Sequence, residues 1–219
     1  MKTGFIFFVL FIMMTLSVCT NNFTQNNAPA SQSVSAAQSG DPGAVPPAAV
    51  SGTLTVSLDY EKQSGSASNQ YAVWIEDMDG ALVKTLYASQ WTARGGYKTR
   101  PDSIAIWAQK SGLASMAKAE ADAVSGATPK AGPQTYTWVL DGTAGNVIPP
   151  GKYRFFVEGT LRWKNYVLYS GVIDLDSKPA SAQAEPEYVY AAVEKYAALT
   201  GDSPENKMIG AVTASFEPF

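Results

Sequence analysis

The sequence is dominated by short runs in which apolar and polar side chains alternate and in which β-branched and aromatic residues are frequent. This pattern is typical of half-buried β-strands. Turn-forming residues separate the runs, and Asp77-Met-Asp-Gly80 predicts the turn of a β-hairpin. The predicted strands lie at 53–60, 71–76, 81–87, 135–140, 151–158, 166–175 (one strand or two) and 207–216. We therefore expect a mainly β protein built as an antiparallel β-sandwich.

Two segments are predicted to be helical insertions in this sandwich. Residues 103–121 place Ile104, Trp107 and Leu113 on a roughly helical period. Residues 187–199 form a clearer amphipathic pattern that ends near a glycine. We interpret both segments as elements that cap the sandwich, so that one domain with one or two inserted helices is expected.

Residues 1–18 are predicted to be a signal peptide. The run from Phe5 to Val18 is apolar and uncharged, and it is too short for a comfortable membrane span. The residues before Cys19 resemble a bacterial lipobox, in which the cysteine is lipidated, and Cys19 is the only cysteine of the chain. This resemblance implies a lipid anchor in the membrane at Cys19. The alternative is ordinary cleavage after residue 30, and in either case the protein is exported to the periplasm or the outer face of the cell membrane.

A tether is predicted to separate this leader from the folded domain. Residues 19–52 contain one charged residue, Asp41, and consist almost wholly of Asn, Gln, Ser, Thr, Ala, Pro and Gly. Such a segment buries too little apolar surface to offset its chain entropy, so it is expected to be disordered. The sandwich domain is then expected to span residues 53–219.

The composition excludes several kinds of chemistry. The chain has no His and one Cys, so it has no His-based catalytic triad, no His metal ligand and no Cys-rich zinc site. With 16 Lys and Arg against 19 Asp and Glu, it lacks the basic character of a nucleic-acid-binding protein. No paired carboxylates, Ser/Lys dyad or phosphate-binding glycine loop is evident. We therefore predict no catalytic residue and no metal site.

The stretch 137–155 (TWVLDGTAGNVIPPGKYRF) carries a recognisable pattern. It resembles the signature of the immunoglobulin-like domain of flagellar-hook-cap proteins. The resemblance implies an immunoglobulin-like β-sandwich in which Trp138 ends a strand in the core. It also implies that Tyr153 begins the next inward-facing strand.

A wider pattern extends over residues 53–219. The hairpin 73–83 is followed by Trp91 and Trp107, then by the segment 122–129 and the strand of Trp138. This order resembles a family of predicted periplasmic proteins of unknown function with an immunoglobulin-like fold. Members of that family are often found alongside flavin transferases and membrane redox proteins, and the resemblance implies such proteins as partners.

The most specific motif is the segment Asp-Ala-Val-Ser-Gly-Ala-Thr at 122–128. It resembles the target site of the bacterial flavin transferase, which joins FMN through its phosphate to a Thr hydroxyl. The resemblance implies a covalent FMN cofactor in phosphoester linkage to Thr128. The residues that the transferase would recognise are Asp122, Ser125, Gly126 and Ala127. A flavin held in this way would make the domain an electron-carrying redox module.

A structural interpretation of the same motif is also open. The segment fits a loop that joins a helix to a sandwich strand, with Asp122 or Ser125 capping the helix end. The protein would then be a non-catalytic binding or assembly module of the cell envelope with no cofactor. An unrecognised enzyme is a third, weaker hypothesis.

The remaining conspicuous residues are given structural interpretations. We expect Trp74 and Trp138 to fill the core, whereas Trp163 lies in a polar hairpin tip and is expected to be exposed and available for binding. The basic run at 94–100 (RGGYKTR) is expected to be a solvated loop, and the acidic residues at 76–79 are expected to form a solvated turn.

Overall fold

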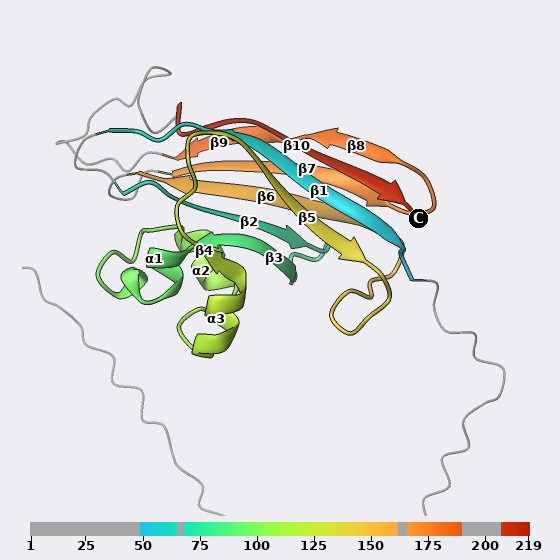
Figure 1. Ribbon diagram of the computed structural model, residues 1–219, viewed down its shortest axis with the longest axis horizontal. Helices are drawn as coiled ribbons and strands as arrows, with labels where there is room; N and C mark the ends of the chain where they lie inside the picture. Colours follow the sequence, from blue (N-terminus) through green and yellow to red (C-terminus); the bar gives the residue numbers. More distant parts are fainter. Residues whose placement is uncertain (1–48, 65–67, 162–165, 190–206) are drawn as a thin grey trace, which may run out of the picture. The chain divides into compact units, whose positions relative to one another are not determined.

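The computed structural model describes residues 49–64, 68–161, 166–189 and 207–219 (Figure 1). The predictions for the signal peptide, for Cys19, for most of the tether and for Trp163 lie outside these residues. None of the helices in the described part of the chain is both long and apolar enough to cross a membrane.

The first sheet has four antiparallel strands in the order β5-β1-β10-β8. These strands are β1 (Gly52–Tyr60), β5 (Gly132–Leu140), β8 (Ala180–Gln183) and β10 (Ile209–Pro218). The first and last strands of the domain are paired, with Leu54 opposite Phe216 and Val56 opposite Ala214. Val50, which precedes β1, is buried and donates its N–H to the carbonyl of Ile148 over 3.0 Å. The packed domain thus already includes Val50, just before the predicted start at residue 53.

The second sheet has six strands in the order β4-β3-β2-β6-β7-β9. These strands are β2 (Gln70–Glu76), β3 (Leu82–Ser89), β4 (Ser125–Gly126), β6 (Gly151–Thr160), β7 (Tyr166–Leu175) and β9 (Glu185–Val189). All neighbours are antiparallel except β3 and β4, which are parallel. The prediction of a mainly β, antiparallel sandwich is confirmed. All the strands predicted from the sequence are present, and the segment 166–175 forms one strand.

The alternation of side chains explains how the two sheets pack. On β1, Leu54, Val56 and Leu58 are buried and belong to the main core between the sheets. Strand β2 is buried along its whole length because both of its faces are covered. Its residues Tyr71, Val73 and Ile75 join the main core, while Ala72 and Trp74 join a second apolar cluster on the opposite face of the sheet.

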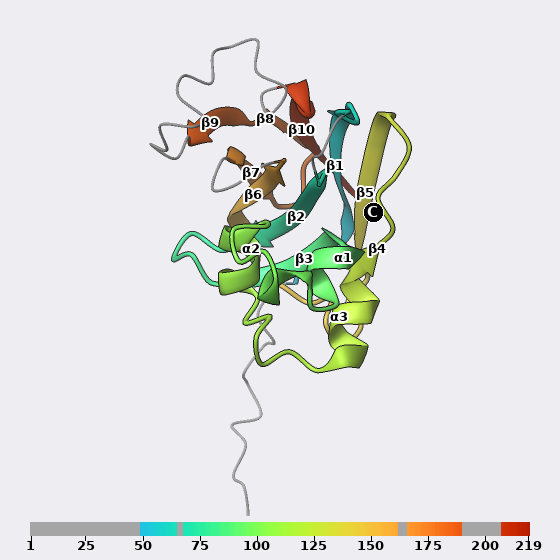
Figure 2. The ribbon, with the colours of Figure 1, turned by 90° about the vertical axis from the view of Figure 1, so that its left-hand side faces the viewer.

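The helices cover that opposite face (Figure 2). Those in the described part of the chain lie between β3 and β5: α1 (Gln90–Ala93), the 3₁₀ helix η1 (Gly96–Lys98), α2 (Ala105–Lys110) and α3 (Lys118–Val124). Trp107 of α2 is fully buried against the sheet in the second cluster. The helix predicted at 103–121 is therefore two short helices, with turns between them around Gly112.

The prediction of a helix at 187–199 is wrong for its first residues, 187–189. Residues 185–189 form β9, which pairs with β7 so that Glu187 lies opposite Leu168. The hydrogen bonds of this ladder override the local helical pattern. The remainder, from residue 190 on, lies outside the described residues.

One carboxylate of the second sheet is buried beneath the helices. Glu158 of β6 has no exposed surface, and its oxygens accept the N–H groups of Ile106 over 3.2 Å and Trp107 over 2.9 Å. These are first-turn N–H groups of α2, which have no acceptor within the helix. Burial raises the pKa of Glu158 to about 7, although the backbone N–H donors favour the charged form.

The raised pKa of Glu158 predicts that the domain becomes less stable as the pH rises. Between its ordinary pKa of 4.5 and the folded value of about 7, the folded state binds the proton more tightly than the unfolded state. The unfolding free energy should therefore fall through this window, by about 3 kcal/mol in all. Denaturant unfolding of the wild type, of Glu158→Gln and of Glu185→Gln, an exposed position, measures this. Glu158→Gln should flatten the slope and Glu185→Gln should keep it, whereas stability that rises with pH in the wild type would contradict the assignment.

Candidate functional site

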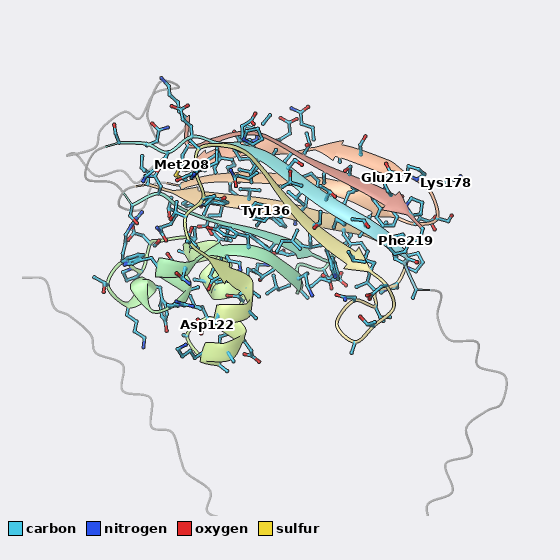
Figure 3. The ribbon with its side chains drawn as sticks, viewed as in Figure 1. Asp122, Tyr136, Lys178, Met208, Glu217 and Phe219 are labelled. Atoms are coloured by element: carbon cyan, nitrogen blue, oxygen red, sulfur yellow. The ribbon has the colours of Figure 1, made fainter. Side chains whose placement is uncertain are left out.

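The candidate motif 122–128 begins in a helix and ends in a solvent-exposed segment. Asp122 lies in α3, Ser125 and Gly126 form β4, and Ala127 and Thr128 are exposed at the start of the connection to β5 (Figures 1 and 3). The structure thus places the motif at the edge of the second sheet. The predicted loop between a helix and a strand is present, but its first part is paired as a strand.

Two cations hold the beginning of the motif. Arg94 Nε lies 2.6 Å from Asp122 Oδ1, and Lys118 Nζ lies 2.5 Å from Asp122 Oδ2. Hydrogen bonds from Lys118 and Arg94 keep the pKa of Asp122 below its ordinary value, so the carboxylate stays charged. Asp122 does not cap the helix, because it lies inside α3 and its carboxylate is bonded to these two side chains.

The middle of the motif is attached to β3. Ser125 and Gly126 pair in parallel with Ala88 and Ser89. Tyr87 directs its hydroxyl at two carbonyls of the motif, at 3.3 Å from Gly126 O and 3.1 Å from Ala127 O. A Cβ at Gly126 would lie 3.0 Å from the Tyr87 ring, so a glycine allows the close approach of the backbone to this ring. The Ser125 hydroxyl is buried without a hydrogen-bond partner, so it caps nothing.

The end of the motif is free of such constraints. Thr128 is exposed, and within the described residues its hydroxyl makes no hydrogen bond. Pro129 follows at once and fixes its own φ, which limits the backbone directly after Thr128. The structure therefore presents a free hydroxyl on a short exposed segment just after an anchored one.

The anchoring of this segment predicts a local effect of Tyr87→Phe. Loss of the hydroxyl removes the donor to the carbonyls of Gly126 and Ala127. We expect the amide hydrogens of 125–128 to exchange about fivefold faster, which corresponds to one hydrogen bond of about 1 kcal/mol. Hydrogen exchange measured by mass spectrometry tests this. Tyr153→Phe is the control, because the Tyr153 hydroxyl donates to Pro149 O over 2.7 Å elsewhere, and equal exchange at 125–128 in all three proteins would contradict the expectation.

Behind β4 lies a cluster of four tyrosines that the sequence analysis missed. Tyr71 contacts the rings of Tyr60, Tyr87 and Tyr136 at centroid distances of 5.2, 4.8 and 6.3 Å, and its hydroxyl bonds that of Tyr136. Burial raises the pKa of Tyr71, and burial together with Tyr87 raises the pKa of Tyr60 to about 12. The phenols therefore stay neutral, and Tyr87 connects the cluster to the motif through the carbonyls of Gly126 and Ala127. The four residues come from four strands, so only the strand pairing brings them together.

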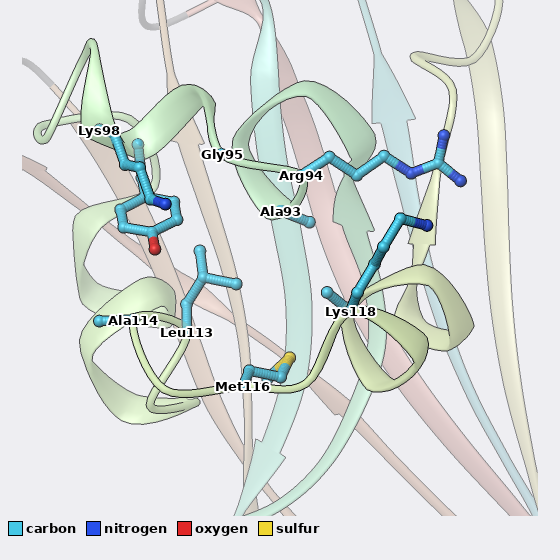
Figure 4. A pocket seen from close by; sticks show the side chains of 10 residues that line it. Ala93, Arg94, Gly95, Lys98, Leu113, Ala114, Met116 and Lys118 are labelled. Atoms are coloured by element: carbon cyan, nitrogen blue, oxygen red, sulfur yellow. The ribbon is translucent and has the colours of Figure 1, made fainter.

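A hollow of about 430 Å³ lies beside the beginning of the motif, between α1–η1 and the segment that leads into α3 (Figure 4). We call it the α1–α3 hollow. Its apolar wall includes Tyr97, Leu113 and Met116, and its cations are those of Arg94, Lys98 and Lys118. The other lining residues are Ala93, Gly95, Ala114 and Ala121.

The remaining candidate residues have structural surroundings. Trp74 and Trp138 are buried, as predicted, and Trp107 is buried with them. The prediction of a solvated loop is wrong for Arg100, which is half-buried. Its Nε lies 3.6 Å from Asp102 Oδ2, and its Nη1 donates to Ser68 O. Within the described residues, no three acidic or Cys side chains are grouped so that they could hold a metal ion.

The acidic turn at 76–79 also has a structural explanation. Asp77 Oδ1 accepts the N–H groups of Asp79 over 3.0 Å and Ala81 over 2.8 Å, which closes the β2–β3 hairpin. The turn itself is confirmed, but the prediction that its acidic residues are solvated is wrong for Glu76, which is buried and accepts hydrogen bonds from Trp74 Nε1 over 2.8 Å and Lys110 Nζ over 3.1 Å.

Comparison with known proteins gives one family match. A protein-family model described as "Predicted periplasmic protein (DUF2271)" matches residues 52–191, which is more than half of the chain. The matched region begins at the first residue of β1 and includes the whole motif 122–128. Neither the curated proteins nor the solved structures contain a match.

Proposed function

This chain belongs to the family of predicted periplasmic proteins matched over residues 52–191, and from that premise we propose that it is an exported redox module that carries FMN covalently on Thr128. In this proposal the Cys19 lipid anchor and the tether hold the domain at the cell envelope. A flavin transferase loads the cofactor, and a membrane redox protein exchanges electrons with it. The flavin supplies the electron chemistry, and the domain supplies its position.

The observation that carries the proposal is the exposure of Thr128 directly after an anchored strand. A transferase must bring its active site to the hydroxyl, so the acceptor needs an accessible side chain on a backbone that does not move away. Thr128 is exposed, whereas Gly126 and Ala127 just before it are bonded to Tyr87. Asp122, at the start of the motif, is charged and bound by Arg94 and Lys118. Its side chain is partly exposed, so a second protein can contact it.

The residues of the motif have different roles in the transfer of FMN. Thr128 Oγ1 is the nucleophile: its bond to the phosphorus of FMN forms while the phosphoanhydride bond of a donor in which the FMN phosphate is joined to a second phosphate breaks, and that second phosphate group leaves with the electron pair of the broken bond. The hydroxyl proton passes to a base of the transferase. The chain itself has no His for that step. Gly126 and Ala127 present little side-chain bulk next to the acceptor.

The proposal is tested by the intact mass of the protein co-expressed in the periplasm with a flavin transferase. We expect a gain of one FMN less one water, together with flavin absorbance that persists after denaturation. Co-expression with an inactive transferase is the control and should give the unmodified mass. An unmodified mass with the active enzyme would contradict the proposal and favour a binding or assembly module without a cofactor.

A further inference from the structure

We propose that the α1–α3 hollow is the binding site for the isoalloxazine ring of the flavin carried by Thr128. This inference rests on the proposed function, since it names where the tethered cofactor lies. It concerns residues outside the motif, and three kinds of observation carry it: position, shape and charge.

The hollow adjoins the acceptor segment. Arg94 and Lys118 line the hollow and at the same time bind Asp122, the first residue of the motif. At the other end of the motif, Gly126 pairs with Ser89, which directly precedes α1. Helix α1 rises about 6 Å over its four residues and ends at Ala93, which lines the hollow. Thr128 is two residues beyond Gly126, at most about 7 Å along the chain, so the flexible ribityl phosphate arm has a short way to bridge.

The shape and the lining suit a flat, mostly apolar ring. The volume of about 430 Å³ falls in the range of roughly 300–1,000 Å³ that is typical of small-molecule sites. Figure 4 shows Leu113 and Met116 directed into the hollow, and the aromatic side chain of Tyr97 also lines it. A Cβ built at Gly95 would meet nothing within 4 Å, which shows open space at this edge of the hollow.

The charge of the hollow is complementary to a phosphoester. Asp122 neutralises one of the two cations that bind it. Lys98 adds another cation, which lies over the Tyr97 ring at 5.8 Å and makes no ion pair with any described residue. The lining is therefore positive overall. This charge favours the negatively charged phosphodiester that joins the flavin to Thr128.

The test uses the flavin-loaded protein and quenching of flavin fluorescence by iodide. We expect the flavin of the wild type to be shielded from iodide and to show high fluorescence anisotropy. In Tyr97→Ala and Ala114→Glu, both the quenching and the anisotropy should approach the values of free FMN. Ala114 is exposed and lines the hollow, so a carboxylate there fills the space and repels the phosphate without disturbing the core. Ala119→Glu is the matched control. Ala119 is exposed on α3 and does not line the hollow, and its substitution makes the same change of charge as Ala114→Glu.

A second measurement separates the two possible failures. The Thr128→Ala protein is titrated with free FMN to millimolar concentration, the range of effective concentration that a short tether provides. We expect saturable binding that Tyr97→Ala weakens about tenfold, by loss of stacking on the aromatic ring. Protein that gains the FMN mass but shows a fully quenchable flavin, unchanged in the variants, would overturn the hollow as the site and leave Thr128 as the acceptor. An unchanged mass contradicts the acceptor itself, and saturable binding of free FMN would then still identify the hollow as a flavin site.

Discussion

Replacing Thr128 with Ala is expected to abolish covalent flavin attachment completely and to leave the fold unchanged. The variant removes the only atom of the side chain that can form the phosphoester. Thr128 is exposed and, within the described residues, its hydroxyl makes no hydrogen bond, so no native hydrogen bond is lost with it. The unfolding free energy should change by less than about 0.5 kcal/mol, as for other exposed positions. Intact mass and denaturant unfolding of the purified variant measure the two effects.

Two further variants make this result specific. Thr128→Ser keeps a hydroxyl at the same position and should still accept FMN. Thr137→Ala removes an exposed threonine from β5, near the motif in the chain but outside it, and should be loaded like the wild type. A full FMN gain in Thr128→Ala would show that another residue is the acceptor.

Replacing Trp107 with Ala is expected to have the largest effect on stability, a loss of about 3–5 kcal/mol of unfolding free energy. Trp107 is fully buried in the cluster that joins the helices to the second sheet. Its indole Nε1–H also donates to Thr85 Oγ1 over 3.0 Å. The substitution leaves a cavity beneath α2 and removes the donor to Thr85. Ala93, Leu113 and Ala121, which line the α1–α3 hollow, belong to the same cluster, so the hollow should be disturbed as well.

Denaturant unfolding with two comparison variants checks the size of this effect. Trp107→Phe keeps most of the buried ring but loses the bond to Thr85, so its cost should be clearly smaller, about 1–2 kcal/mol. Met78→Ala changes a side chain that is 52% exposed in the β2–β3 turn and should cost less than about 0.5 kcal/mol. A cost for Trp107→Ala as small as that of Met78→Ala would mean that the helices do not depend on this cluster.

The strands could be predicted from the sequence because their pattern is local. The alternation in 53–60 specifies which side chains face the core, and β1 shows the predicted strand with Leu54 and Val56 buried. The turn at Asp77–Gly80 follows from Asp and Gly, whose preferences need no distant partner. The prediction failed at 187–189, where pairing with β7 outweighs the helical period.

The surroundings of the candidate site could not be predicted, because they depend on contacts between distant parts of the chain. The motif 122–128 was found from its residues alone. Arg94, however, meets Asp122 from 28 positions away, and Tyr87 meets Gly126 from 39 positions away. The basic run at 94–100 was interpreted as a solvated loop because nothing local indicates that Arg94 faces α3.

The most direct test of the central claim is a peptide map of the flavin-loaded wild type. Trypsin cleaves after Lys118 and Lys130, so the peptide 119–130 contains the whole motif and only two hydroxyl side chains, Ser125 and Thr128. Fragmentation of this peptide should place the FMN on Thr128, since the Ser125 hydroxyl is buried in β4. FMN on Ser125, on another peptide or on none would contradict the claim that Thr128 is the acceptor.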